Sequence, residues 1–403
     1  MGVNNSKLNN QVVVYLQGPG AVRIKLLYLV SLFLVFALGV NSKFTGVNNV
    51  EVFQKVFILA VSLIIFFLSG FNRLLIWNYV FFILIVFLTF FLSTIGVVDI
   101  LFVIYSLASM SIFYVNLSLN NAFYIKQVVL ALKVLPISML AFSFLLSLFS
   151  SYPLYIVEYT GAFRLASGID PALYAFLIFY SIVIVVFDSI KTNRVEIRLL
   201  TLLFVLLLLT GSRGPLLASL IVTLSLVPLR KNPEIRSFIK IGAIPVFIVF
   251  VYLLGNMMLR SMLEDEPGFN LSGRNFAWEF MISSFDSINL FGRGLGSVTL
   301  ATVGIGGNNL SAFIAPHNEY VRFWYDLGWI GSCLFFVNIL IILYLCVFKL
   351  SGRFAFFRVL FCIGILFFCF FDNVFSTHHS AFPLAVFLKY AYDSRLNKGN
   401  GCE

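Results

Sequence analysis

The sequence predicts an all-α polytopic integral membrane protein with about 12 transmembrane helices. Hydrophobic residues make up 61% of the 403 residues, and charged residues make up only 11%. Apolar runs of about 20 residues, long enough to cross a hydrocarbon core of about 30 Å, recur along the chain. Helices are expected because an unpaired backbone amide in lipid costs several kcal/mol, and a helix satisfies its own backbone.

The apolar runs divide the chain into spans joined by short connections and one long polar loop. Their approximate centres are Leu32, Leu63, Phe82, Ser106, Leu140, Ile178, Leu206, Leu220, Ile248, Phe336, Ile365 and Val386. We therefore expect a single polytopic membrane domain over residues 1–403, with one large loop over residues 260–318. The stretch Ala37-Leu38-Gly39 loosely resembles a signal-peptide cleavage site, but the long polar segment before it and the many spans after it favour an uncleaved first helix.

The net charge of +10 does not indicate a nucleic-acid-binding protein, because the basic residues are not gathered in one polar domain. They fall mainly before the first span and in every second connection, at positions such as Arg23, Arg73, Lys126, Lys191, Arg230, Lys349 and Lys389. Cytoplasmic loops carry an excess of Lys and Arg. Both termini are therefore expected in the cytoplasm, with the large loop on the outer face.

Beyond the first outer loop, the basic residues predicted to face outward are all arginines. They stand at Arg164, Arg213, Arg260, Arg274, Arg293 and Arg322. A guanidinium binds two oxygens at once and stays protonated, so several arginines converging at a membrane surface would suit a pyrophosphate carried on a lipid. The alternative for each is an isolated contact with headgroups or water.

Arg213 lies in the tight connection Thr210-Gly211-Ser212-Arg213-Gly214-Pro215 between two apolar spans. Its charge is therefore expected at the membrane boundary. Burying Arg at mid-bilayer costs about 2.5–3.5 kcal/mol on insertion scales, so the guanidinium should have a partner or a polar cavity. The alternative is that its side chain extends to the headgroups.

A helix is expected after Ser272, a good N-cap residue that precedes Arg274. The apolar residues that follow recur at helical spacing: Phe276, Phe280, Met281, Phe285 and Ile288. The free amides at the start of this helix, beside Arg274, would form an anion site at the lipid surface; an interfacial structural helix without a ligand is the alternative. The following Gly292-Arg293-Gly294-Leu295-Gly296 is interpreted as a turn that presents Arg293, since it lacks the features of a Walker loop.

Pro316 suits the first turn of the next helix and would place His317 close to the amino end of that helix. The helix dipole there favours the neutral imidazole, which can accept a proton. The alternative for His317 is a loop-capping histidine. Glu319 and Arg322 are three residues apart on the same predicted helix, a spacing that allows a structural ion pair.

Three further polar features have a functional and a structural interpretation. Asp372, His378 and His379 form a weak candidate metal cluster, because ligands from one short connection are poor evidence for a site. Lys133 lies well inside a span, and its amine is expected to extend toward the cytoplasm. The cysteines follow neither a disulfide pattern nor a Cys-x-x-Cys metal pattern.

Several motifs, taken in order, resemble the O-antigen polymerase and O-antigen ligase superfamily. They are the Thr-Gly-Ser-Arg-Gly turn at residues 210–214, Ser272-Gly273-Arg274 followed by Trp278, the glycine-rich segment at 292–296, and Pro316-His317-Asn318-Glu319-Tyr320 running into Asp326-Leu327-Gly328-Trp329-Ile330-Gly331. The resemblance covers roughly residues 201–331 by motif. It covers the whole chain by the number of spans and the position of the large loop.

The resemblance implies a metal-independent glycosyl transfer at the periplasmic face of the bacterial inner membrane, in a fold similar to the class C glycosyltransferases. By similarity, His317 would be the general base, and Arg213 and Arg274 would stabilise the departing pyrophosphate, with Arg293 and Arg322 as further members. Glu319, Tyr320 and Ser272 would support the site. The implied partners are a polyprenyl-pyrophosphate-linked oligosaccharide donor and acceptor, membrane lipids and a chain-length regulator protein, with no cofactor and no nucleic acid.

Within the superfamily, the His-Asn-Glu-Tyr segment and its following Val321-Arg322 favour a Wzy-type polymerase, which extends a lipid-linked glycan, over a ligase, which transfers the glycan to lipid A core. A flippase or other transporter also uses about 12 helices, but its informative charges are expected near the membrane midplane between repeats. A structural or scaffold role would not explain why Arg and His residues are collected in the polar loop.

Overall fold

The computed structural model describes residues 30–31, 33–35, 37–39, 50–92, 100–149, 154–157, 163–229, 274–283, 290–298 and 317–399. The helices are α4 (Val50–Ser69), α5 (Arg73–Leu92), α6 (Ile100–Ser118), α7 (Ala122–Phe149), α8 (Pro171–Thr192), α9 (Ile197–Leu209), α10 (Arg213–Thr223), α12 (Arg274–Ser283), α14 (Glu319–Leu343), α15 (Ala355–Phe371) and α16 (His378–Gly399). Shorter helical turns follow at Leu224–Leu229, Tyr344–Phe348 and Gly352–Phe354. The strands are β1 (Tyr155–Val157) and β2 (Phe163–Leu165).

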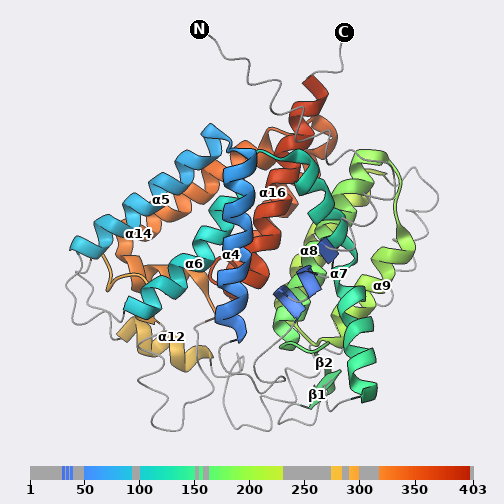
Figure 1. Cartoon of the computed structure of the whole chain (residues 1–403), viewed down its shortest axis with the longest axis horizontal. Helices are drawn as coiled ribbons and strands as arrows, with labels where there is room; N and C mark the ends of the chain where they lie inside the picture. Colours follow the sequence, from blue (N-terminus) through green and yellow to red (C-terminus); the bar gives the residue numbers. More distant parts are fainter. Residues whose placement is uncertain are drawn as a thin grey trace.

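The described helices form a bundle in which α8 is almost wholly enclosed by its neighbours (Figure 1). Six of the helical segments are long and apolar enough to cross a membrane, and Val103–Ser118, Ile197–Leu209 and Arg213–Leu229 are shorter apolar segments. Each predicted span centre that falls on described residues lies in a helix, whereas Leu32 and Ile248 lie outside the described residues. The helical membrane architecture is therefore confirmed, and the total of about 12 spans stays a prediction.

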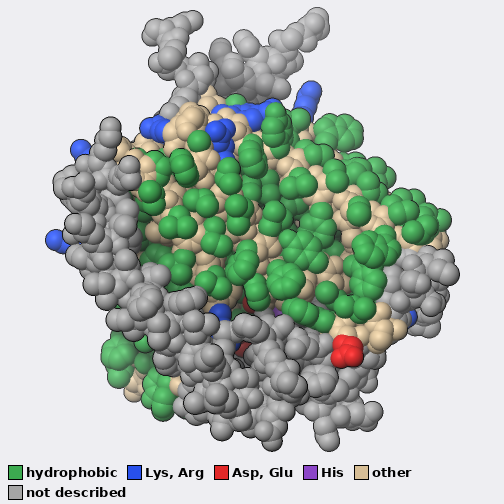
Figure 2. Space-filling model, turned by 180° about the vertical axis from the view of Figure 1, so that it is seen from behind, with side chains coloured by type: hydrophobic (Ala, Val, Ile, Leu, Met, Phe, Trp, Pro, Cys, Tyr) green, Lys and Arg blue, Asp and Glu red, His purple; other side chains and the backbone are tan. Residues whose placement is uncertain are grey.

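The surface separates an apolar side from a basic end. Figure 2 shows hydrophobic side chains over most of one face, with Lys and Arg gathered at the end where α16 finishes. Contacts between basic residues and neighbouring elements mark this basic end: Lys191 donates to Ser394 (3.1 Å), Arg353 to the carbonyl of Lys191 (3.1 Å) and Arg395 to the carbonyl of Leu345 (3.1 Å). The predicted cytoplasmic side corresponds to this end.

Lys133 of α7 has carboxylate partners on neighbouring elements. Its ammonium lies 2.5 Å from Glu196, just before α9, and 3.4 Å from Asp188 of α8. The hydroxyl of Tyr390 on α16 donates to the other oxygen of Asp188 (2.9 Å). The buried lysine therefore joins helices near the basic end, in keeping with an amine that extends toward that end.

Small residues let helices approach closely where lipid provides no hydrophobic drive for association. A Cβ on Gly331 of α14 would lie 2.7 Å from a methyl of Thr89 on α5, and these two helices run side by side in Figure 1. A Cβ on Gly364 of α15 would lie 3.1 Å from a methyl of Val222 on α10. These contacts fix α14 against α5 and α15 against α10.

The glycine-rich segment 290–298 packs against a break in α14. Gly328 has φ 68° and ψ −172°, which interrupts the helix, and the amide of Ile330 donates to the carbonyl of Leu290 (3.1 Å). A Cβ on Gly328 would lie 2.2 Å from the amide nitrogen of Gly292, and a Cβ on Gly292 would lie 2.5 Å from the carbonyl of Asp326. Only glycine fits at both positions, so two of the sequence motifs form one packed unit.

The carboxylate of Asp326 completes this unit. Although fully buried, it accepts hydrogen bonds from the amides of Gly296 (3.0 Å) and Val298 (2.9 Å) and from the hydroxyl of Ser297 (3.0 Å). The segment 292–296 is therefore a turn, as the sequence indicates, and Asp326 holds it against α14.

The β1–β2 hairpin was not anticipated by the all-α prediction. Its antiparallel register pairs Tyr155 with Leu165 and Val157 with Phe163. Three-residue strands give too short an alternation to recognise in a sequence this apolar. The hairpin and α12 lie at the end of the molecule opposite the basic end (Figure 1), which we call the hairpin end.

Gly328→Ala is expected to lower the thermal unfolding midpoint of the purified protein. The added Cβ meets backbone atoms and forces an L-residue into a left-handed conformation, a strain on the order of 1–3 kcal/mol. Gly352→Ala is the matched control, because a Cβ there meets nothing within 4 Å. Equal midpoints for the two variants would contradict the packed unit.

Candidate active site

His317 and the start of α10, which carries Arg213, both lie at the carboxyl end of α15. His317 precedes α14, and its Nδ1 lies 3.0 Å from Oδ1 of Asp372, the residue that follows α15. The same carboxylate oxygen accepts the amide of Asn373 (3.0 Å). The imidazole is 37% exposed while the carboxylate is 9% exposed, so Asp372 fixes the ring from the buried side and leaves the other side accessible.

The backbone around His317 differs from the predicted arrangement. Asn318 is the N-cap of α14, and its side chain accepts from the amides of Tyr320 (2.9 Å) and Val321 (3.1 Å). The helix therefore begins at Glu319, and the expectation that Pro316 would stand in its first turn is wrong. Pro316 itself lies outside the described residues.

His317 has a positive φ of 47°, in the left-handed region that non-glycine residues seldom adopt. This conformation turns the chain just before the Asn318 cap. Backbone strain of this kind is concentrated at functional sites and persists where the surrounding structure imposes it.

Glu319 holds the connection between α15 and α16. It is fully buried, and its Oε1 accepts from the amides of Phe375 (2.6 Å) and Ser376 (3.0 Å). The hydroxyl of Ser376 lies 2.9 Å from both carboxylate oxygens. Glu319 therefore has a structural role beside His317: it fixes the connection that begins with Asp372.

Arg213 is the first residue of α10 and is half-buried. The turn before it is fixed by Arg164 of β2, whose guanidinium donates to the carbonyl of Thr210 (2.6 Å) and to the hydroxyl of Ser212 (2.9 Å). A Cβ on Gly211, which has φ 65°, would lie 3.2 Å from Nε of Arg164. The Thr-Gly-Ser-Arg turn is thus shaped around the side chain of Arg164.

The start of α10 packs against the end of α15. A Cβ on Gly214 would lie 3.1 Å from Cβ of Phe371. The neighbour of Arg213 therefore contacts the neighbour of Asp372, and the structure brings Arg213 into the same corner as the His317–Asp372 pair.

The helix α12 reaches this corner through an aromatic contact. Trp278 packs edge-on against Phe370, with ring centroids 5.6 Å apart. Arg274 begins α12, as the sequence indicates, and positions four residues apart share a helix face. The side chain of Arg274 and all of Ser272 lie outside what the structure describes.

Arg293 and Arg322 have other partners. Arg293 is exposed, and its guanidinium donates to the hydroxyl of Tyr325 (3.1 Å). Arg322 is buried, donates to the hydroxyl of Ser106 (3.2 Å) and lies 3.8 Å from the carboxylate of Asp326.

Arg322 therefore lies within ion-pair distance of Asp326, and its charge also acts on Glu319. Tyr320 binds α15, because its hydroxyl donates to the carbonyl of Leu366 (3.0 Å) while its ring stacks on Phe336 at 4.9 Å. Arg322 and Tyr320 therefore hold helices together close to the His317–Asp372 pair.

His378 and His379 lie buried at the start of α16, with ring centroids 4.0 Å apart. Asp372, their candidate co-ligand, is turned to His317 instead. Within the described ranges, no three His, Cys, Asp or Glu side chains are grouped to hold a metal ion.

Sequence reasoning named two residues at this site, Asp372 and Arg164, but missed their partners. Asp372 follows directly on an apolar run, and its position at a span end was the available signal, but its partner lies 55 residues away along the chain. Arg164 was recognised as an outward-facing arginine, yet nothing in the sequence links it to a turn 46 residues later.

Residues 199–336 match the family model described as O-antigen ligase. A search among characterised proteins finds no match to the chain. The matched range includes Arg213, α12, the 290–298 turn and His317, and it ends before Asp372. Together with the long apolar helices, this match supports the resemblance of the chain to the O-antigen polymerase and ligase superfamily of membrane proteins.

Proposed function

We propose that this protein is a glycosyltransferase that joins O-antigen or related polysaccharide repeat units carried on polyprenyl pyrophosphate, at the periplasmic face of the inner membrane. The observation that supports this best is the contact between His317 and Asp372 next to the start of α10. It unites a proton acceptor, the carboxylate that orients it and an arginine at a helix start in one corner of the hairpin end.

His317 is the general base in this proposal. With Nδ1–H donated to Asp372, the Nε2 atom is left to accept a proton from the acceptor hydroxyl. That hydroxyl oxygen attacks the anomeric carbon of the donor glycan as the bond from this carbon to the pyrophosphate oxygen breaks. Attack from the face opposite the leaving group inverts the anomeric configuration.

The leaving pyrophosphate needs positive charge and hydrogen-bond donors. Arg213 and the amide groups at the start of α10 supply both, and Arg274 at the start of α12 is the second proposed ligand. Guanidinium groups neutralise the developing charge without a divalent cation, so we propose a metal-independent transfer. Arg293 and Arg322, held by Tyr325 and Asp326, belong to the support of the site.

Polymerisation is the reaction we propose first, because the sequence around His317 favours it, with a chain-length regulator as a further partner. Ligation of the glycan to lipid A core is the second candidate, favoured by the description of the matching family model. Both reactions use the same leaving group and base, so the acceptor alone separates them.

Replacing His317 by Ala is expected to abolish product formation, because the general base is removed. Asp372→Asn is expected to lower kcat roughly 100-fold or more, because the imidazole is then no longer held in its orientation. The measurement is glycan transfer by purified protein, with membrane abundance checked for each variant. Normal chain length from the His317 variant would defeat the assigned base.

Glu319→Ala serves as the contrasting variant for that experiment. It removes the acceptor of three buried donor groups, each of which costs about 1–3 kcal/mol when left unpaired, and should lower the yield of folded protein. If Glu319→Ala folds normally and His317→Ala does not, the roles assigned to the two residues are reversed.

Arg213→Ala is expected to reduce kcat about 100- to 1000-fold, the usual effect of losing one stabilising donor of a developing anion. Arg194→Ala is the control, because Arg194 is exposed in the connection between α8 and α9, at the other end of the bundle. Equal activity of the two variants would remove Arg213 from the site.

Purified protein incubated with defined lipid-pyrophosphate repeat units and a chelator is expected to yield a ladder of glycans on a gel. Transfer of a single glycan to added lipid A core, without a ladder, would identify a ligase. Movement of the glycolipid between leaflets without lengthening would indicate a transporter. Complete loss of product on chelation would contradict the metal-independent mechanism.

A further inference from the structure

A groove of about 400 Å³ lies beside the β1–β2 hairpin, where α9 ends. Its lining residues are Tyr155, Phe163, Arg164, Leu165 and Leu209. Tyr155, Phe163 and Leu209 are 57%, 70% and 53% exposed, so a largely apolar surface is presented at the hairpin end. The volume falls in the range of small-molecule sites, which are mostly apolar with few polar groups.

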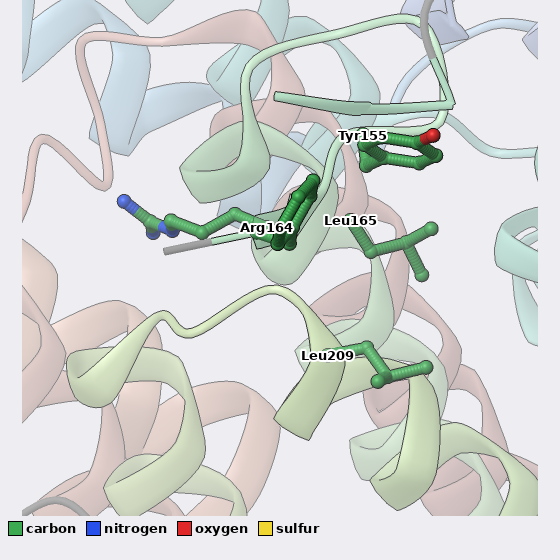
Figure 3. Close-up of a pocket in the computed structure, with 5 residues that line it drawn as sticks. Tyr155, Arg164, Leu165 and Leu209 are labelled. Atoms are coloured by element: carbon green, nitrogen blue, oxygen red, sulfur yellow. The ribbon is translucent and has the colours of Figure 1, made fainter. Parts of the chain in front are cut away.

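Arg164 joins this groove to the turn that carries Arg213. Figure 3 shows the aliphatic stem of Arg164 along the groove, with the guanidinium extending away from Tyr155 and Leu209. That guanidinium donates to Thr210 and Ser212, in the turn directly before Arg213. The apolar groove and the start of α10 therefore lie on opposite sides of a single side chain.

We propose that this groove holds the first isoprenoid units of the lipid donor, an inference that rests on the proposed function. A prenyl diphosphate is an apolar chain that ends in two anionic phosphates. The groove, followed by the amides and the guanidinium at the start of α10, presents the same order of apolar surface and positive charge. Arg164 is a positioning residue in this arrangement, because it sets the distance between the chain and the phosphates.

Direct binding is tested with the full-length protein and a prenyl diphosphate that carries a photoreactive diazirine on its first isoprene unit. Crosslinks are expected on the hairpin or on the last turn of α9. An excess of unlabelled prenyl diphosphate should prevent them, and an excess of phospholipid should not. Crosslinks confined to other segments, or equal competition by phospholipid, would overturn the proposal, the latter because the groove would then be an ordinary lipid contact.

The kinetic test compares a polyprenyl diphosphate donor with an ethyl diphosphate donor that has no chain to fill the groove. Phe163→Ser and Leu209→Ser are each expected to raise KM for the polyprenyl donor about tenfold, equivalent to about 1.4 kcal/mol of lost binding. KM for the ethyl donor and kcat for both donors should stay unchanged. Leu224→Ser is the control, since Leu224 is 55% exposed on another element.

The outcomes separate this inference from the proposed function. If the wild-type protein transfers glycan but the two variants change KM equally for both donors, the groove does not hold the chain and the glycosyltransferase proposal stands. If the wild type forms no product from either donor while the diazirine still labels the hairpin, the reaction is wrong and the prenyl site stands.

Discussion

The connection between α15 and α16 is pinned to the start of α14, and the candidate site depends on this interaction. His317 meets Asp372 at the beginning of the connection, while Glu319, two residues later, accepts three hydrogen bonds from Phe375 and Ser376. A buried carboxylate is costly unless donors surround it. The two contacts therefore fix three helix ends together at the hairpin end of the bundle.

The arginines recognised in the loops stand in two kinds of position. Arg164 and Arg322 donate to neighbouring protein groups and set the positions of helices and turns. Arg213 and Arg274 begin helices, and Gly214 and Trp278 of these helices pack on Phe371 and Phe370. Helix starts add free amide donors to the guanidinium, which is the combination that a phosphate group requires. The chemistry of arginine alone does not distinguish these roles.

A second constraint explains why glycines are spaced as they are in the matched domain. Gly292 and Gly328 approach so closely that neither can carry a side chain, and Asp326 binds the turn between them. This unit interrupts α14 about three turns after His317, at ~5.4 Å per turn. The part of α14 that follows His317 is thereby a separate short segment, and it packs on α12 through Met281.

The sequence by itself determined that the chain is a helical membrane protein, where most of its described apolar helices lie, and that Arg213, Arg274 and His317 stand at or beside element ends. These properties are local, because apolar length, capping residues and turn residues act within about 20 residues. Tertiary structure alone decided that Asp372 orients His317, that Arg164 shapes the Arg213 turn and that Arg322 pairs with Asp326. The first two join residues 55 and 46 positions apart, and the third joins residues four positions apart on α14 in place of the predicted partner three positions away. Each depends on how helices pack, which in lipid is set by shape and buried hydrogen bonds rather than by a pattern readable along the chain.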